Sequence, residues 1–232
     1  MLRVAVARIP DALLAGGGAA PEWMGADERR RWAVLAPGAR CAFAASRQLL
    51  RALLQAATGV PEADWDVSAQ AGVAPGARAL ASREVHVSLS HRLGWVAAAV
   101  SDAPVGVDIE CDRAPRSEAR ERAVLMLSPG ELVAWQGPPA SAQETALLTR
   151  WTAKEAWFKA SPPESAPWDF RRIAARACPP GDPGANVRTW TSPPVHLALC
   201  FPDAQALAKI ECDMPAAAAS SFWHVHRVDS AN

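Results

Sequence analysis

The stretch Gly-Val-Asp-Ile-Glu at residues 106–110 alternates apolar and acidic side chains, as a strand with one buried face does. This alternation directs Val107 and Ile109 toward a core and projects Asp108 and Glu110 together from the other face. Two neighbouring carboxylates repel each other unless a cation lies between them, and oxygen ligands suit Mg²⁺. The stretch therefore predicts either a magnesium site or a solvated strand end with two ordinary acids.

A second stretch, Trp-Thr-Ala-Lys-Glu-Ala-Trp-Phe-Lys, occupies residues 151–159. Helical spacing puts Trp151, Glu155 and Lys159 on one face, at i, i+4 and i+8. An ordinary surface Glu-to-Lys pair has the same spacing, but the aromatic neighbours indicate burial, where a charged pair is less common. Few of the 24 basic residues are lysines, yet both Lys154 and Lys159 lie here, which indicates a requirement for an amine.

Two shorter segments carry further candidates. Ser-Leu-Ser-His at residues 88–91 ends a predicted strand, where Ser90 and His91 either hold a phosphate or cap a turn. Neighbouring strand residues point apart, and no Gly-x-Ser-x-Gly elbow surrounds either serine, so a hydrolase dyad is excluded. Ser-Pro-Gly-Glu at residues 128–131 has the pattern of a helix capping box, which gives Glu131 a structural role.

Periodicity divides the chain into two similar α+β halves, residues 1–103 and residues 104–232. Short echoes support a duplication: Trp-Asp-Val at 65–67 against Trp-Asp-Phe at 168–170, and Val-His-Val at 85–87 against Val-His-Leu at 195–197. In the first half we expect strands at 2–9, 65–68, 85–90 and 95–101, and helices at 27–35 and 39–57. In the second half we expect strands at 105–110, 170–177, 187–191, 195–201, 209–212 and 222–228, and helices at 118–127, 129–135 and 142–160.

The connections between strands follow from turn residues. Residues 91–94 are expected to form a tight connection, and residues 102–104 a turn. The strands at 85–90, 95–101 and 105–110 would then form an antiparallel meander.

Composition excludes several classes of protein. Basic and acidic residues number 24 each, which argues against a strongly basic nucleic-acid binder. Five cysteines without a Cys-x-x-Cys pair indicate neither a disulfide framework nor a zinc site, but reduced thiols in a cytoplasmic protein. No stretch approaches the ~20 apolar residues of a membrane span. The remaining histidines alternate along predicted strands and are interpreted as core or surface residues rather than ligands: His86, His196, His224 and His226.

These segments, in this order, resemble the surfactin-type (Sfp-type) 4′-phosphopantetheinyl transferase family. The match rests on residues 88–91, 106–110, 127–131 and 151–159, and the pair G-[VI]-D-[VI]-E and W-x-x-K-E-[AS]-x-x-K is the family's diagnostic signature. The resemblance implies a pseudo-dimer of two similar α+β halves with the active-site cleft between them. It also implies transfer of 4′-phosphopantetheine from coenzyme A to a serine hydroxyl of an apo acyl or peptidyl carrier protein, with release of adenosine 3′,5′-bisphosphate.

The resemblance also implies roles for matching residues. Asp108, Glu110 and Glu155 would hold Mg²⁺, or Mn²⁺ in its place, against the pyrophosphate. Glu155 would accept the serine proton, with Glu131 as a second candidate, and Lys159 would neutralise phosphate charge during catalysis. Coenzyme A would be bound by residues of both halves: Arg47, Ser90, His91, Asp108, Lys154 and Lys159. Secondary contacts are expected from the basic residues Arg29, Arg30, Arg31 and Arg78.

Two departures from the family pattern stand out. Residues 71–78 lack the usual Gly-Lys-Pro segment, with Arg78 as the substitute candidate, and a proline-rich loop at 161–167 replaces Gly-x-Gly-Leu. A non-catalytic coenzyme A- or nucleotide-binding relative is the first alternative, although such a relative should have lost a metal acid or the motif lysine. A metal-dependent phosphohydrolase is the second alternative, but this sequence lacks the cluster of water-positioning histidines that such an enzyme needs. Because a fused pseudo-dimer makes its own cleft, we expect a monomer.

Overall fold

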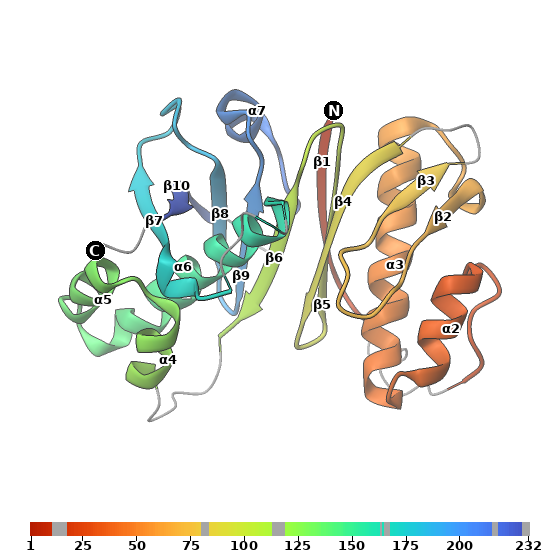
Figure 1. Ribbon diagram of the computed structural model, residues 1–232, viewed down its shortest axis with the longest axis horizontal. Helices are drawn as coiled ribbons and strands as arrows, with labels where there is room; N and C mark the ends of the chain where they lie inside the picture. The colour runs from red at the N-terminus through yellow and green to blue at the C-terminus, as the bar shows by residue number, and fades with distance from the viewer. Residues whose placement is uncertain are drawn as a thin grey trace. The chain divides into compact units, whose positions relative to one another are not determined.

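The computed structural model describes residues 1–10, 18–79, 84–112, 119–162, 164, 168–214 and 218–228. The chain forms two compact units: unit 1 is Met1–Val105 with Ile210–Asp213, and unit 2 is Gly106–Lys209 with Met214–Asn232. In the described residues each unit contains one five-stranded antiparallel sheet and one long helix (Figure 1). The α+β class predicted from the sequence is therefore confirmed.

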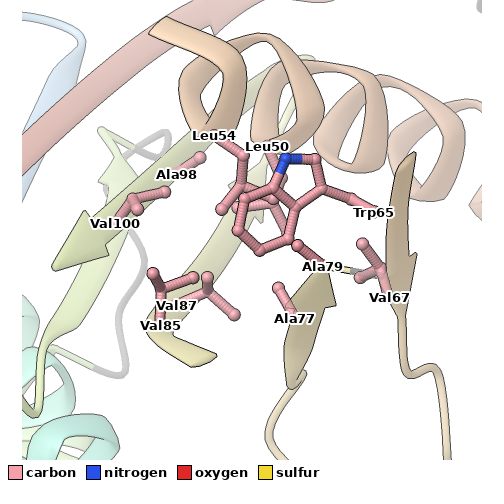
Figure 2. Close-up of a cluster of buried hydrophobic side chains, with 10 residues drawn as sticks. All are labelled: Leu50, Leu54, Trp65, Val67, Ala77, Ala79, Val85, Val87, Ala98 and Val100. Carbon is pink, nitrogen blue, oxygen red and sulfur yellow. The ribbon is translucent and has the colours of Figure 1, made fainter. Parts of the chain in front are cut away.

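Unit 1 is built around helix α3 (Pro37–Thr58), which covers one face of its sheet. The apolar positions repeat at helical spacing, so Leu50 and Leu54 point together into the core. Figure 2 shows both leucines against the ring of Trp65, with small side chains of the strands around it. The helix ends at Gly59, whose left-handed φ of 75° suits a glycine C-cap.

The sheet of unit 1 has the order β1-β5-β4-β3-β2. Its strands are β1 (Leu2–Arg8), β2 (Trp65–Val67), β3 (Ala77–Ala79), β4 (Glu84–Arg92) and β5 (Trp95–Ser101). Helix α2 (Ala26–Val34) precedes α3, and a short 3₁₀ helix, η1 (Glu62–Asp64), leads into β2.

Unit 2 repeats this plan with helix α6 (Ala140–Ala160) on one face of its sheet. The strands run in the order β6-β9-β8-β10-β7. They are β6 (Gly106–Cys111), β7 (Ile173–Cys178), β8 (Val187–Ser192), β9 (Val195–Cys200) and β10 (Ala219–Arg227). The other helices are α4 (Ala119–Met126), α5 (Pro129–Gln136), η2 (Phe170–Arg172) and α7 (Ala204–Lys209).

The two sheets differ in one strand. In both units the first strand lies at one edge, and the strand that follows the long helix lies at the other edge. Unit 1 fills the space between them with strands in chain order, whereas unit 2 inserts its last strand, β10, between β8 and β7. The two units therefore share one architecture, with one strand differently connected.

The sequence echoes that suggested the duplication do not occupy equivalent positions. Trp65 is buried in β2, whereas Trp168 precedes η2 and is 85% exposed. Residues 85–87 lie in β4, but residues 195–197 lie in β9, which pairs with the first strand of its sheet as β5 does in unit 1. The echoes therefore do not mark equivalent residues, although the two similar α+β halves that they suggested are observed.

Three expectations about strands were wrong. The strand at residues 106–111 does not continue a meander with β5, because β6 pairs with β9 in the other sheet. Strand β4 extends through Arg92, and the turn is only Leu93 and Gly94, both with positive φ. Residues 204–209 form helix α7, and the strand expected at 209–212 is absent.

Some expectations concern residues outside the described ranges, and one observed strand was not predicted. Residues 113–118, which include the expected start of the helix at 118–127, and residues 163 and 165–167 of the proline-rich loop lie outside the described residues. The three-residue strand β3 was missed because Ala-Arg-Ala carries too weak a pattern. No helix in the described ranges is long and apolar enough to cross a membrane.

Candidate active site

The close approach of α6 to β6 builds the site in unit 2. A Cβ atom added at Gly106 would lie 1.9 Å from the carbonyl oxygen of Ala156 and 2.8 Å from the backbone nitrogen of Ala160. Ala153 and Ala156 are fully buried on the facing side of the helix. Only glycine on the strand and small residues on the helix permit this contact, so side chains of α6 come within reach of the acids of β6.

Asp108 lies on the face of the sheet that α6 covers. Its partner in the neighbouring strand is Ala198, a member of the core under α6, and Glu110 projects from the same face two residues later. Lys159 of α6 donates to Asp108 Oδ1 at 2.6 Å and to the carbonyl oxygen of Val107 at 3.2 Å. The motif strand and the motif helix are therefore joined by a charge-assisted hydrogen bond at an 8% exposed carboxylate.

Glu155 lies one helical turn before Lys159 and has an unusual ionisation. The pKa of its carboxyl is raised to about 7: burial is the largest cause, the charges of Asp108 and, less strongly, Glu110 also raise it, and Lys159 opposes the shift. A carboxyl group that titrates near neutral pH is suited to accept a proton from a substrate. The three predicted acids thus act on one another across the contact between β6 and α6.

The chemistry of these acids fits a divalent cation. Three carboxylates and no nitrogen or sulfur ligand form the oxygen donor set that Mg²⁺ prefers, and their mutual repulsion would be relieved by the ion. Across the described residues, no three His, Cys, Asp or Glu side chains are arranged to ligate one ion as they stand. The carboxylates would therefore have to close on the ion as it binds.

Lys154, by contrast, is fully buried in a structural network. Its ammonium donates to Glu131 Oε2 at 2.6 Å, to the Met126 carbonyl at 2.8 Å and to the Phe170 carbonyl at 3.3 Å. Burial lowers the pKa of Lys154, and the carboxylate of Glu131 counteracts this. All three ammonium hydrogens are used, so none remains for a phosphate, and the geometry points away from the coenzyme A contact predicted for this lysine.

Glu131 is held equally firmly. Besides Lys154 it accepts hydrogen bonds from the backbone N–H of Ser128 and of Ala175, both at 2.8 Å, and it is 9% exposed. The bond to Ser128 is the capping-box contact that the sequence predicted. The side chain thus ties α5 to β7 and α6, which favours a structural role over that of a second base.

In unit 1, Arg47 is a buried cation that lacks a carboxylate partner in the described residues. Its Nη1 donates to the Ser68 carbonyl at 3.0 Å, and its guanidinium lies over the ring of Phe43. Its Nε has no hydrogen-bond partner among the described residues. Burial lowers the pKa of Arg47 to about 10. The nearby Glu28 is already engaged by Arg51 through two bonds of 2.8 and 2.6 Å. A buried guanidinium that lacks its own carboxylate partner among the described residues is costly, so this residue is suited to an anionic ligand.

The other residues of unit 1 that were predicted to contact coenzyme A differ in the face they occupy and in their exposure. His91 continues the face of β4 that α3 covers, the face of Val87, whereas Ser90 points to the opposite face and is buried. Arg78 is exposed on β3, and the cluster on α2 is partly engaged, since Arg29 donates to the Glu22 carbonyl and Arg30 pairs with Asp27. Arg31, the last residue of the cluster, is partly buried.

Sequence reasoning missed Gly106, and the Glu28–Arg51 and Lys154–Glu131 pairs. The two ion pairs join residues far apart in the chain, and no local pattern identifies such partners. Gly106 had a weak signal, because a glycine that begins an apolar strand often marks a close backbone approach.

Comparison with known proteins agrees with the motifs of unit 2. Residues 104–201 match the model of the 4′-phosphopantetheinyl transferase superfamily. A curated protein of Bacillus pumilus, 4′-phosphopantetheinyl transferase psf-1, is 39% identical over 74 residues, which are 32% of this chain and 30% of that protein. The chain thus matches less than a third of that relative's length.

Proposed function

We propose that this chain transfers the 4′-phosphopantetheine group of coenzyme A to a serine hydroxyl of an apo carrier protein, because its residues 104–201 match the model of the 4′-phosphopantetheinyl transferase superfamily. One observation carries the proposal: Lys159 contacts Asp108 at 2.6 Å beside Glu155, whose pKa is raised to about 7. A cation for phosphate charge and an acceptor for a proton thus lie together, as this transfer requires.

The reaction proceeds by one displacement at phosphorus. The serine oxygen forms a bond to the β-phosphorus of coenzyme A, and the bond from that phosphorus to the bridging oxygen breaks. The hydroxyl proton passes to Glu155, and adenosine 3′,5′-bisphosphate leaves with the electron pair on the bridging oxygen. Lys159 balances charge on the phosphate oxygens.

Asp108, Glu110 and Glu155 would hold Mg²⁺, with Mn²⁺ as a substitute, and the ion would stabilise charge on the pyrophosphate. Support comes from the all-oxygen donor set and from the repulsion that raises the pKa of Glu155. The ammonium of Lys159 is free to exchange its bond to Asp108 for one to a phosphate oxygen, since it is 28% exposed.

Unit 1 supplies coenzyme A contacts in this proposal. Arg47 is the strongest candidate, because its buried charge has no carboxylate partner among the described residues. His91 lies on the same side of that sheet as α3, and the basic residues of α2 are further candidates. Five free cysteines suit a reducing compartment, which supports a cytoplasmic location.

The direct test is the mass of apo carrier proteins after incubation with the chain, coenzyme A and Mg²⁺. We expect a gain of one phosphopantetheine on at least one acyl or peptidyl carrier, and loss of the gain when a chelator removes the ion. Glu155→Gln should reduce transfer by at least about a hundredfold, since positioned proton transfer contributes about 10²–10⁴-fold. The matched control is Glu164→Gln, which changes an exposed acid beyond α6 and should leave transfer unchanged.

Two outcomes would contradict this proposal. Coenzyme A binding without transfer to any carrier in a panel of fatty acid, polyketide and nonribosomal peptide types would favour a non-catalytic relative. Full activity of Glu155→Gln would remove this residue from the role of base.

A further inference from the structure

The outer face of β10 carries two histidines that the proposed reaction does not use. Trp223 and Val225 of this strand belong to the core under α6, so His224 and His226 project from the opposite face of the sheet. Both imidazoles are partly exposed, and their ring centroids lie 4.8 Å apart with the planes inclined by 33°. Two imidazoles held side by side on a strand form a preorganised pair of nitrogen ligands.

The spacing of the rings matches two ligands of one ion. A metal–nitrogen bond to histidine is about 2.0–2.1 Å, which puts the ion roughly 3.2 Å from each ring centre. Two such rings are then about 4.5 Å apart at a right angle and about 5.2 Å apart at a tetrahedral angle. The observed 4.8 Å falls between these values, so the strand already holds the two rings at the separation that one ion requires.

The surroundings leave the pair accessible on one side. Strand β8 pairs with β10 only up to Trp223, so both histidines have a neighbouring strand on the β7 side alone. There His226 lies opposite Ala174, a small residue, and His224 lies opposite Arg176, which is exposed. The Nδ1 atom of His226 is shielded from solvent and has no hydrogen-bond partner in the described part of the chain, which leaves a polar atom to be satisfied.

We propose that His224 and His226 form a site for a borderline transition-metal ion such as Ni²⁺, Zn²⁺ or Cu²⁺, with water completing the coordination. Imidazole ligands suit these ions and not Mg²⁺, so the site differs in selectivity from the carboxylates of β6 and α6. It also differs from them in place, because those acids lie on the face that α6 covers. The proposal differs from the sequence-based interpretation of these two histidines as core or surface residues, and it does not depend on the proposed transferase activity.

The test is titration calorimetry with Ni²⁺ on the full chain without an affinity tag, in excess Mg²⁺ to saturate the carboxylates. We expect one Ni²⁺ per chain. His224→Gln and His226→Gln should each weaken binding by at least about tenfold, since loss of groups that support a metal site already costs about 10–100-fold. The matched control is His86→Gln, which alters an exposed histidine on β4.

A second variant separates this site from adventitious binding. Arg176→Ala removes the cation opposite His224 and should tighten Ni²⁺ binding several-fold, because like charges repel. Equal Ni²⁺ affinity in wild type and in both histidine variants, with the fold intact by circular dichroism, would overturn the proposal. Unchanged affinity in Arg176→Ala would equally contradict the assigned location.

Discussion

Glu155 links the pH of the solution to the stability of the protein. Its pKa is raised from 4.5 to about 7, so the folded chain holds a proton that the unfolded chain has released between these values. Stability that depends on the neutral carboxyl is fully present below about pH 4.5 and is lost as pH rises through about 7. Glu155→Gln stays neutral at every pH, so we expect this variant to lose less stability than wild type over that range without divalent ions.

Denaturant unfolding of both proteins below and above this range measures the effect. The control Glu164→Gln should reproduce the wild-type profile, because Glu164 is exposed. Parallel pH profiles for wild type and Glu155→Gln would show that the carboxyl does not titrate near neutral pH.

The buried pair of Lys154 and Glu131 should respond to substitution in a non-additive way. Lys154→Met leaves a carboxylate at 9% exposure without its cation, and breaking a buried pair costs about 3–5 kcal/mol. Lys154→Met with Glu131→Leu removes both charges, and we expect a smaller loss than for Lys154→Met alone. Chemical unfolding of the single and double variants checks this expectation, and a double variant that loses as much stability as Lys154→Met, or more, would contradict it.

Among individual residues, the sequence identified the acids and Lys159 because their spacing repeats within one strand and one helix. It assigned Glu131 a capping role that the structure contains, but it gave Lys154 a ligand role where the structure has a buried ion pair. The difference is physical: a motif shows which residues belong together in sequence, whereas burial and hydrogen-bond partners depend on elements that arrive from elsewhere in the chain.

At the level of elements, the contact of α6 with β6 has no room for a side chain at residue 106. Gly106→Ala would bring its Cβ to 1.9 Å from the Ala156 carbonyl unless the helix moves. Overpacking of this kind costs about 1–3 kcal/mol, and a helix displaced from the strand would lengthen the contact between Lys159 and Asp108. We expect reduced stability together with reduced transfer, measured by thermal unfolding and by carrier mass.

Gly38→Ala is the matched control for this substitution. Gly38 lies in α3, nothing approaches its added Cβ within 4 Å, and alanine favours helix over glycine by about 1 kcal/mol. It should raise stability slightly and leave transfer unchanged. Wild-type activity and stability in Gly106→Ala would disprove the close packing of α6 on β6.

Most helices and strands were predictable because their apolar positions repeat with the correct period, as in α3 and β5. The sequence did not reveal which strands pair with one another. Alternation in residues 106–110 predicted a strand but could not indicate that β6 pairs with β9 in a separate sheet. The short segments β3 and α7 have too few residues for a period to be visible, so β3 was missed and α7 was mistaken for the start of a strand.

Across the whole molecule, each sheet has its own hydrophobic core. Val100 belongs to the core of unit 1 and Val225 to that of unit 2, and both are almost fully buried. Val225→Ala should lower amide hydrogen-exchange protection in β7, β8 and β10 more than in the strands of unit 1, and Val100→Ala should do the reverse. Equal loss of protection in both sheets from either variant would show that the two units unfold together.

The position of β10 also has a consequence for the newly made chain. All strands of unit 1 have been synthesised by residue 101, whereas the second sheet has an open space between β8 and β7 until residues 219–227 leave the ribosome. During that interval two strand edges can pair with the wrong partner. Translation therefore exposes unit 2, and with it the acids of β6 and α6, to misfolding until β10 has been made.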